Sequence, residues 1–177
     1  GADIVVTTFE PGHAEPLGAD YATLAALNPA LIYCSITGWG PTGPYAHYPA
    51  YDGVVAAKTG RMQYFASQPR REGPAYSAVR VGSHGAAQAA IMGIFAALIA
   101  RRRDGLGQLI ETSLLQGTFS SDLMGMVRTQ LAEKFPEQFG NDPYASYGMP
   151  TLQYQPVVTK DGVWIQFANL LEHHFHA

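Results

Sequence analysis

Three acidic residues are the best placed on expected helices or strands, where a fixed carboxylate could act as a base or a nucleophile. They are Asp52, Glu111 and Asp122. Asp52 stands at an expected helix start, where the helix dipole favours a negative charge, so capping is the simpler interpretation of it. Glu111 lies in a strand-like run, and we expect it to face outward or to pair with an arginine. Position alone therefore assigns no reaction to these carboxylates.

A second group that could do chemistry is the set of histidines near the end of the sequence, His173, His174 and His176. Imidazoles this close together could capture a divalent ion. Glu172 is the one nearby carboxylate that could complete the ligand shell. With a single cysteine in the chain, Cys34, a cysteine-based zinc site is excluded. We therefore expect no metal site.

The sequence holds no phosphate loop of the nucleotide-hydrolase kind and no Gly-x-Ser-x-Gly elbow. Gly38, Gly40 and Gly43 have the spacing of Gly-x-Gly-x-x-Gly, but Pro44 follows Gly43 and blocks most of a helical start, so this motif is a weak signal. The loop over 37–49 is nonetheless rich in glycine and proline, with Trp39, Tyr45 and Tyr48 between them. It follows an expected buried strand, and open α/β sheets bind ligands in loops after the carboxyl ends of their strands. The pattern fits a ligand-binding loop and a structural loop pinned by aromatic rings equally well.

The elements that would position these residues alternate between strands and helices. Apolar runs predict strands over 4–7, 31–36, 76–81 and 108–113, while helical spacing and helix-stopping residues predict helices over 21–27, 51–59, 83–104 and 114–135. Ser83 is expected to be the N-cap of the third helix, which ends in three arginines that suit the negative end of its dipole. The strand–helix–strand order predicts an α/β fold with a parallel sheet.

The segment over 137–177 differs in composition from the rest of the chain. Residues 137–150 carry few aliphatic side chains and are expected to form a linker. Beyond them, two apolar runs around Asp161-Gly162 predict a β-hairpin, because this pair supplies the backbone angles of a tight turn. We therefore expect a large domain over 1–136, a linker over 137–150 and the start of a smaller α+β domain over 151–177. The abrupt opening on an interior-type strand leads us to expect a piece of a longer protein.

Composition limits the class of protein. The chain has 177 residues, of which 47% are hydrophobic and 14% charged, and a net charge of −3. This suits one sizeable core and excludes a generally basic protein that coats nucleic acid. The most apolar stretch, 85–100, is expected to be a core helix rather than a membrane anchor, because it is short for a span. A lone cysteine and no leader-like start favour the cytoplasm, with neither membrane nor nucleic acid as partner.

Several segments together resemble the family III coenzyme A transferases, the group that holds formyl-CoA and carnitine CoA-transferases and α-methylacyl-CoA racemases. They run in family order from residue 2 to about residue 117. The matching segments are Ala2-Asp3-Ile4-Val5-Val6, Phe9-Glu10-Pro11-Gly12, 27–40, Gly43-Pro44-Tyr45, Tyr51-Asp52, 93–98 and Gly107-Gln108.

The resemblance implies a Rossmann-like large domain, a smaller domain, and two chains threaded through one another as interlocked rings. It implies transfer of CoA from an acyl-CoA to a small free carboxylic acid, through an aspartate that attacks the thioester to form a mixed anhydride. CoA and acyl-CoA would be substrates, and no cofactor would be tightly bound. The assembly would be a homodimer or a pair with a homologous half.

Carried over by position, the resemblance assigns CoA binding to Thr8, Phe9, Gly12, Tyr51 and Asp52. The adenine would lie near Phe9, and the thiol end would lie near Tyr51 and the start of the long helix. The histidine of the racemases falls on Tyr51, a residue that matches the transferase pattern instead. The resemblance therefore favours a transferase over a racemase.

The family's catalytic aspartate falls on Ser83, with His84 beside it. Serine cannot form the acyl anhydride, so Ser83 with His84 as its base would need other chemistry. The basic residue expected to contact a phosphate is also replaced, around Glu15-Pro16. Thr7-Thr8 stands where the family usually has Glu-Asn.

Three interpretations remain open at this point. The chain belongs to a CoA-transferase in which Ser83 replaces the usual aspartate. Alternatively, it is a non-catalytic CoA-binding or structural half of a longer tandem transferase, whose other half supplies the aspartate. A second alternative is an acyl-CoA racemase or isomerase.

Overall fold

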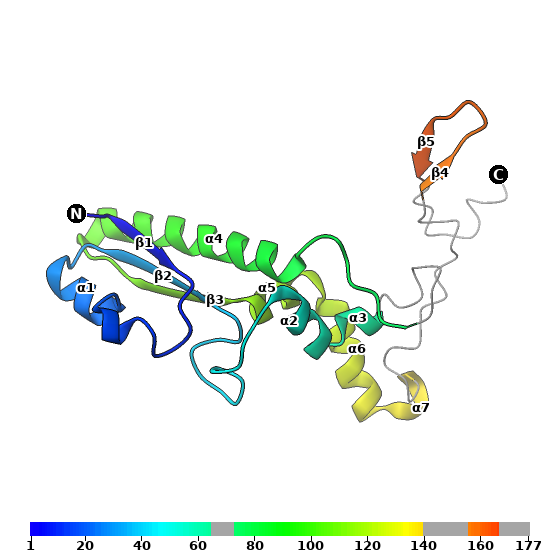
Figure 1. The fold of residues 1–177 in the computed structure, drawn as a ribbon, viewed down its shortest axis with the longest axis horizontal. Helices are drawn as coiled ribbons and strands as arrows, with labels where there is room; N and C mark the ends of the chain where they lie inside the picture. The colour runs from blue at the N-terminus through cyan, green and yellow to red at the C-terminus, as the bar shows by residue number, and fades with distance from the viewer. Residues whose placement is uncertain (65–72, 140–155, 167–177) are drawn as a thin grey trace.

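The structure, a computed structural model of the chain, describes residues 1–64, 73–139 and 156–166. Figure 1 shows its elements along the ribbon. The three histidines considered for a metal site, and residues 140–150 of the expected linker, lie outside the described residues. In chain order the elements are β1 (Ile4–Thr7), η1 (Glu15–Leu17), α1 (Tyr21–Leu27), β2 (Ile32–Thr37), α2 (Asp52–Lys58), α3 (Arg61–Tyr64), α4 (Val81–Asp104), β3 (Leu109–Ser113), α5 (Leu114–Ser121), α6 (Leu123–Lys134), α7 (Pro136–Phe139), β4 (Pro156–Val158) and β5 (Trp164–Gln166).

A parallel three-stranded sheet in the order β1-β2-β3 positions everything that follows. Ile4 of β1 pairs with Ile32 of β2, and Cys34 of β2 pairs with Ile110 of β3. α1 connects β1 to β2, and the segment with α2, α3 and α4 connects β2 to β3. Parallel neighbours need such crossovers, because a tight hairpin joins only antiparallel strands. The predicted α/β class with a parallel sheet is confirmed.

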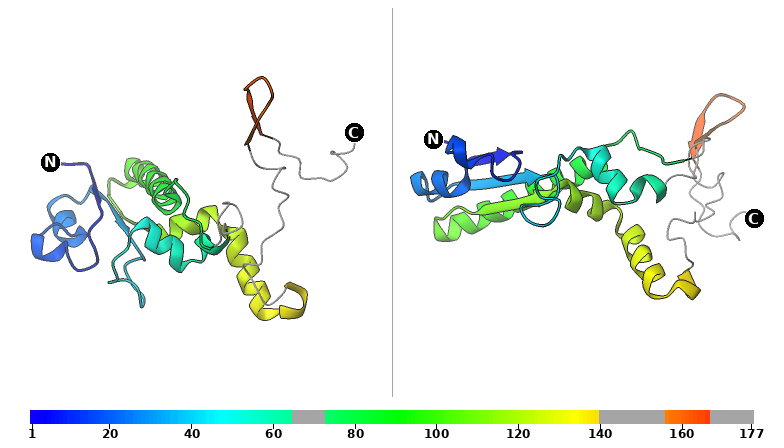
Figure 2. Two further views of the ribbon diagram at one scale, coloured as in Figure 1. Left: turned by 45° about the vertical axis from the view of Figure 1, so that its right-hand side comes forward. Right: turned by 60° about the horizontal axis from the view of Figure 1, so that its bottom comes forward.

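Different helices cover the two faces of the sheet (Figures 1 and 2). Alternate residues of a strand point to opposite faces. Gly93 of α4 lies so near Ile110 that a Cβ on the glycine would be 2.8 Å from its Cγ2 atom, so α4 covers the face of Ile110. Tyr33 of β2 points to the other face, where its ring lies 6.0 Å from that of Tyr21 in α1. The buried strand β2 is therefore covered on both sides.

α4 and α5 cross at glycines, which lets their backbones approach closely. A Cβ on Gly85 of α4 would lie 2.2 Å from the carbonyl oxygen of Gly117 in α5. A Cβ on Gly117 would lie 2.2 Å from the carbonyl oxygen of Gly82. Atoms at that distance overlap, so neither position accepts a side chain without moving a helix. The crossing therefore determines where α4 begins relative to α5, which follows β3 directly.

The start of α4 differs from the prediction. The helix begins at Val81, so the prediction of Ser83 as its N-cap is wrong, and Ser83 is the third residue of the helix. Arg80 holds the N-cap position and its side chain makes no capping hydrogen bond. Asp52 takes that part instead, because its carboxylate accepts a hydrogen bond from the amide of Ser83. The interpretation of Asp52 as a capping residue holds for α4 rather than for its own helix, α2.

The strand predicted over 76–81 is also wrong. Residues 76–80 form no strand, and Val81 already belongs to α4. The amide of Ala75 donates to the carbonyl of Met62, and the ring of Tyr76 lies beside Gly53 of α2. This segment is held by helices rather than by a strand neighbour.

The long helix predicted over 114–135 is two helices, α5 and α6, with a break at Asp122. The backbone of Asp122 has φ −134° and ψ 33°, outside the helical region. Its carboxylate lies 3.4 Å from the guanidinium of Arg61, so a partner distant in sequence holds the break. Residues 137–139, assigned above to the linker, form part of α7. The predicted hairpin is confirmed as β4 and β5.

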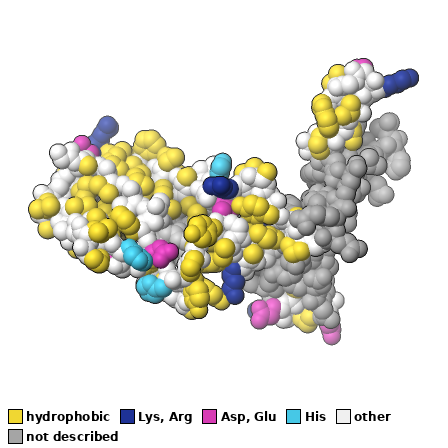
Figure 3. Space-filling model, in the orientation of Figure 1, with side chains coloured by type: hydrophobic (Ala, Val, Ile, Leu, Met, Phe, Trp, Pro, Cys, Tyr) yellow, Lys and Arg dark blue, Asp and Glu magenta, His cyan; other side chains and the backbone are white. Residues whose placement is uncertain are grey.

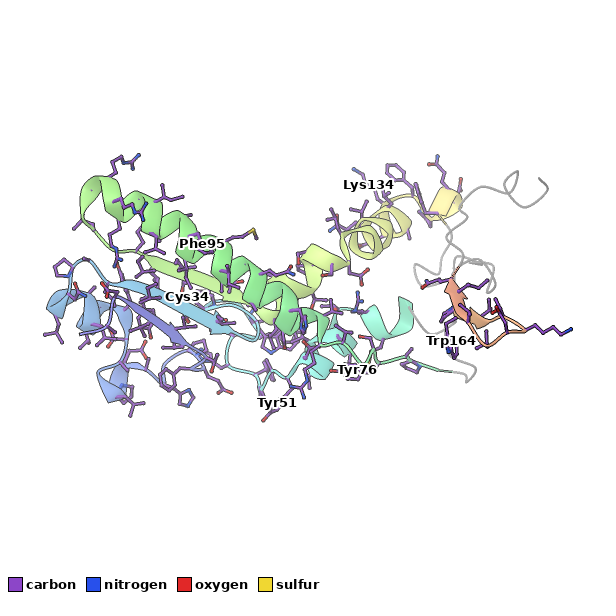
Figure 4. The ribbon with its side chains drawn as sticks, turned by 90° about the horizontal axis from the view of Figure 1, so that it is seen from above. Cys34, Tyr51, Tyr76, Phe95, Lys134 and Trp164 are labelled. Carbon is purple, nitrogen blue, oxygen red and sulfur yellow. The ribbon has the colours of Figure 1, made fainter. Side chains whose placement is uncertain are left out.

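By length and composition α4 could cross a membrane, a test that the core helices of soluble proteins also meet. Its small residues pack inward, and Gly85, Ala86, Ala90 and Ala97 are buried. Larger apolar side chains on the helix, Phe95 among them, are exposed, and Figure 3 shows hydrophobic atoms along this part of the molecule. Figure 4 looks down on α4 and labels Phe95 on the helix, with Cys34 in the sheet.

Arg101 ties the end of α4 to the beginnings of two strands. Its guanidinium donates to the carbonyl of Ala30 at 3.0 Å and lies 3.6 Å from the carboxylate of Asp3. Replacing Arg101 with methionine keeps most of the apolar stem and is expected to lower the free energy of unfolding by about 2 kcal/mol, because a charged donor is lost. Denaturant unfolding measures this effect. Arg102→Met is the matched control, and an equal loss in both variants would contradict this role for Arg101.

Candidate functional site

The carboxyl ends of β1 and β2 open onto two adjoining pockets. The first, of about 220 Å³, lies between the turn after β1 and the loop after β2. The second, of about 240 Å³, lies on the sheet face opposite α4. Both are lined by Phe9, Glu10, Pro11 and Thr37. The two pockets therefore adjoin, and we treat them as one candidate site, in the place where open parallel sheets bind ligands.

Four of the five residues assigned to CoA line these pockets. Thr8, Phe9 and Tyr51 line the first, and Phe9 and Gly12 line the second. Asp52 lines neither of the two. Figure 4 shows Tyr51 at the start of α2, with its side chain directed away from the sheet. Its exposed fraction of 74% leaves the ring free to contact a ligand.

The second pocket is acidic. Among the residues that the structure describes, its lining includes four carboxyl side chains, Glu10, Glu15, Asp20 and Glu111, and no lysine or arginine. Glu111 is exposed and faces this pocket, and it pairs with no arginine of the described residues. A lining of one sign repels ligands of that sign. The phosphate groups of a ligand would be disfavoured here, while Glu10 is the one acidic residue that lines the first pocket in the described part of the chain.

The loop over 37–49 is fastened at both ends. The hydroxyl of Thr37 accepts a hydrogen bond from the amide of Gly40, and the carbonyl of Gly38 accepts one from the amide of Leu115 at the start of α5. A Cβ on Gly38 would lie 1.8 Å from the Cβ of Ala50, so the loop returns directly against its own beginning. This contact brings Tyr51 to the mouth of the first pocket.

Aromatic rings fill the middle of the same loop. The centroids of Trp39 and Tyr45 lie 5.5 Å apart, and those of Tyr45 and Tyr48 lie 5.6 Å apart. The ammonium of Lys58 lies 4.8 Å from the Tyr45 ring, a cation–π distance. Trp39 is buried, whereas Tyr48 is exposed and lines the first pocket. The loop is thus both pinned by aromatic rings and in contact with the candidate site.

Behind Tyr51, a carboxylate and a serine meet across 31 residues of sequence. Oδ2 of Asp52 accepts hydrogen bonds from the amide of Ser83 at 2.7 Å and from its hydroxyl at 2.9 Å. The side chain of His84 is exposed, and among the described residues no hydrogen bond joins it to Ser83. The proposed Ser83–His84 pair is therefore not formed here, and the polar partner of Ser83 is Asp52.

Arg61 and Asp122 form an ion pair that the sequence did not reveal. Their side chains are 14% and 13% exposed, so the pair is largely buried. Burial raises the pKa of the Asp122 carboxyl above its ordinary value, and the nearby guanidinium only partly offsets this. Arg61 also lines a small hollow beside Asp52, closed by Tyr76 and Val81. Within the described part of the chain, no cluster of side chains has the composition of a metal site.

Comparison with known proteins agrees with this architecture. The family model for "CoA-transferase family III" matches residues 1–177. The acetyl-CoA:oxalate CoA-transferase of Acetobacter aceti is 37% identical over 164 residues, which cover 89% of this chain and 41% of that protein. The succinate–glutarate CoA-transferase of Agrobacterium fabrum is 40% identical over 117 residues, which cover 64% of this chain and 28% of that protein.

Among solved structures, a CAIB/BAIF family protein from Brucella suis superposes with a TM-score of 0.69 at 33% identity. The match covers 91% of this chain and 41% of that protein. The chain thus spans about two fifths of the length of the relatives that it matches along most of its sequence. Since the family model extends over every residue, the chain belongs to CoA-transferase family III.

Proposed function

We propose that the whole protein transfers CoA from an acyl-CoA to a small free carboxylic acid, and that this chain forms one wall of the CoA site. The observation that carries the proposal is the meeting of Thr8, Phe9 and Tyr51 around one pocket at the carboxyl ends of two parallel strands. The names of the relatives, which pair acetyl-CoA with oxalate and succinate with glutarate, support a short dicarboxylic acid as one substrate.

The charges divide the two pockets between parts of CoA. The first pocket, with exposed Phe9 and Tyr51 and with Glu10 as the one acidic residue among its described lining, suits the uncharged pantetheine arm and the acyl group. The acidic second pocket, which includes Glu15, disfavours the phosphates. No tightly bound cofactor is part of this proposal, because CoA itself is the group that moves.

The family resemblance places a lost phosphate contact around Glu15, so a change of charge there tests whether the acidic lining repels CoA. Glu15→Lys is expected to lower the Kd for CoA several-fold at low salt, because a repulsive charge becomes an attractive one. The gain should shrink at high salt, where exposed charges are screened. Calorimetry with the intact protein measures both values. An unchanged Kd at low salt would place the phosphates away from Glu15.

Two other functions use the same fold and are separable by experiment. In a non-catalytic half of a tandem enzyme, the intact protein would bind CoA here while the transfer depended on another copy of this domain. In a racemase, acyl-CoA would exchange the hydrogen at its second carbon for solvent deuterium. The transferase proposed here gives a new acyl-CoA without that exchange. Mass spectrometry of the thioester products distinguishes the three.

The proposal also covers the domain boundaries, the cellular compartment and the assembly of the protein. We propose a large domain over 1–136 and the start of a smaller one over 151–177, joined near 137–150. The protein would act in the cytoplasm as a homodimer or as a pair with a homologous half. Light scattering on the intact protein tests the assembly.

A further inference from the structure

The carboxylate of Asp52 is hydrogen-bonded to Ser83, the residue at the position of the family's catalytic aspartate. Oδ2 is fixed by the amide and the hydroxyl of Ser83, at 2.7 and 2.9 Å. Among the described residues, Oδ1 accepts no hydrogen bond. We infer that Asp52 is the nucleophile of CoA transfer, an inference that rests on the function proposed above.

Asp52 lies beside the lining of the first pocket rather than in it. Asp52 directly follows Tyr51, which lines that pocket together with Leu114. A Cβ on Gly82 would lie 3.2 Å from Oδ2 of Asp52 and 3.1 Å from the carbonyl oxygen of Leu114, so both atoms border the same small space. On its other side Asp52 lines the hollow with Arg61. A thioester whose arm lies in the first pocket would reach Asp52 past the ring of Tyr51.

The other carboxylates near the pockets are less suited to the task. The side chain of Glu10 is 54% exposed, so its geometry is loosely held. Asp20 uses both oxygens for hydrogen bonds from Thr23. Glu111 lies on the sheet face opposite α4, in the acidic pocket. A nucleophile needs one fixed orientation and one free oxygen, and Asp52 combines the two.

A carboxylate conserves the energy of the thioester, and a serine does not. Attack by Ser83 would give an oxygen ester, from which an acceptor carboxylate could form an anhydride only by expelling an alkoxide. An alkoxide is a far poorer leaving group than a thiolate or a carboxylate. An aspartate instead gives an acyl anhydride, whose leaving group is a carboxylate. Ser83 therefore acts as a positioning residue that holds Oδ2.

The reaction then balances without any further reactant. Oδ1 of Asp52 attacks the acyl carbonyl carbon, the C–S bond breaks, and the electron pair leaves on the CoA sulfur as a thiolate. The thiolate attacks the aspartyl carbon of the anhydride, and the donor acid leaves as a carboxylate. The acceptor carboxylate attacks this aspartyl thioester and releases the thiolate again. The thiolate attacks the acceptor's acyl carbon, which forms the new acyl-CoA and restores Asp52.

The variant that tests this is Asp52→Asn made together with Gly53→Ala. Asparagine keeps an oxygen that can accept the hydrogen bonds of Ser83, and asparagine is a good helix cap, so the structural role survives. Gly53→Ala is needed because an Asn-Gly pair deamidates back to aspartate. A Cβ on Gly53 meets nothing nearer than 3.6 Å, so Gly53→Ala alone is the matched control.

In the intact protein, Gly53→Ala should transfer CoA, while the double variant should lose at least about a thousandfold in kcat and keep its Tm within a few degrees. Hydroxylamine added with acyl-CoA should convert Asp52 to a hydroxamate in the Gly53→Ala protein, detected by peptide mass spectrometry. Ser83→Ala should lower kcat by about tenfold, the loss of one orienting hydrogen bond, and should still yield the hydroxamate at Asp52.

Results that contradict the role of Asp52 differ from results that contradict the proposed function. Transfer that persists in the double variant, or a hydroxamate mapped to a residue other than Asp52, overturns the inference and leaves the proposed function standing. A wild-type protein that binds CoA but transfers it to no carboxylic acid overturns the proposed function and the inference together. Restored transfer after Ser83→Asp in the Asp52→Asn, Gly53→Ala protein would further support the inference, because it returns a carboxylate to the same contact.

Discussion

Replacing Gly117 with alanine is expected to destabilise the large domain by about 3 kcal/mol, more than a side-chain clash in a flexible region would cost. The added Cβ would lie 2.2 Å from the carbonyl oxygen of Gly82 and 2.3 Å from the amide nitrogen of Ala86. Both contacts are to backbone in the first turns of α4, which no rotamer change can relieve. The helices must separate, and the contact between Asp52 and Ser83 must change with them.

Denaturant unfolding of the intact protein measures this cost, with Gly53→Ala as the matched control. Gly53 is also a helical glycine, but a Cβ there meets Tyr76 at an ordinary 3.6 Å. Alanine is favoured over glycine inside a helix by up to about 1 kcal/mol, so the control should be neutral or stabilising. If Gly117→Ala were no more costly than Gly53→Ala, the close crossing of α4 and α5 would be refuted.

The second large effect is expected at Gly38. Alanine there would place a Cβ 1.8 Å from the Cβ of Ala50, so the chain just before Tyr51 and Asp52 must move outward. A displacement on the order of 1 Å at a reacting group can lower a rate about a hundredfold. We therefore expect Gly38→Ala to reduce kcat/KM for CoA transfer by about that factor, with a smaller loss in stability.

A compensating substitution makes this test specific. Ala50→Gly removes the atom that clashes, and the next contact of the new Cβ would be the Cα of residue 50 at a tight but tolerable 3.3 Å. The double variant should recover most of the activity that Gly38→Ala loses. Rates measured for the two single variants and the double variant form a cycle, and additive losses would contradict the proposed contact.

Local pattern was sufficient to predict the sheet and most helices. The apolar runs around Ile4, Ile32 and Ile110 are long enough for buried strands, and their separation by helical segments leaves a parallel sheet as the simple solution. The resemblance to family III CoA-transferases, read from short segments such as Tyr51-Asp52, is confirmed by the family match over the whole chain.

The structural features that the sequence analysis predicted wrongly or missed depend on contacts between residues distant in sequence. The start of α4 was misplaced because its cap comes from Asp52, 31 residues earlier, and a local search for a capping side chain finds Ser83 instead. The break at Asp122 depends on Arg61, which no helical periodicity includes. The close approach of Gly85 and Gly117 follows from a helix crossing, so the two glycines have no distinguishing local pattern.

The candidate site could be predicted only in part, because some of its residues are placed by the sheet and others by contacts between distant helices. Thr8, Phe9, Gly12 and Tyr51 follow strand ends or begin the next helix, and parallel topology brings such positions to one edge. The role of Asp52 could not be inferred from its position on α2, because the group that orients it belongs to α4. The acidic character of the second pocket likewise arises from four separate segments.

The most direct test of the proposed function uses the intact protein, an acyl-CoA and a carbon-13-labelled dicarboxylic acid such as oxalate or glutarate. Mass spectrometry follows the thioesters and free CoA over time. A transferase should yield labelled acyl-CoA, with the donor acid released in equal amount and little free CoA. Hydrolysis to free CoA alone, or no labelled thioester with any acid tested, would contradict CoA transfer by this protein.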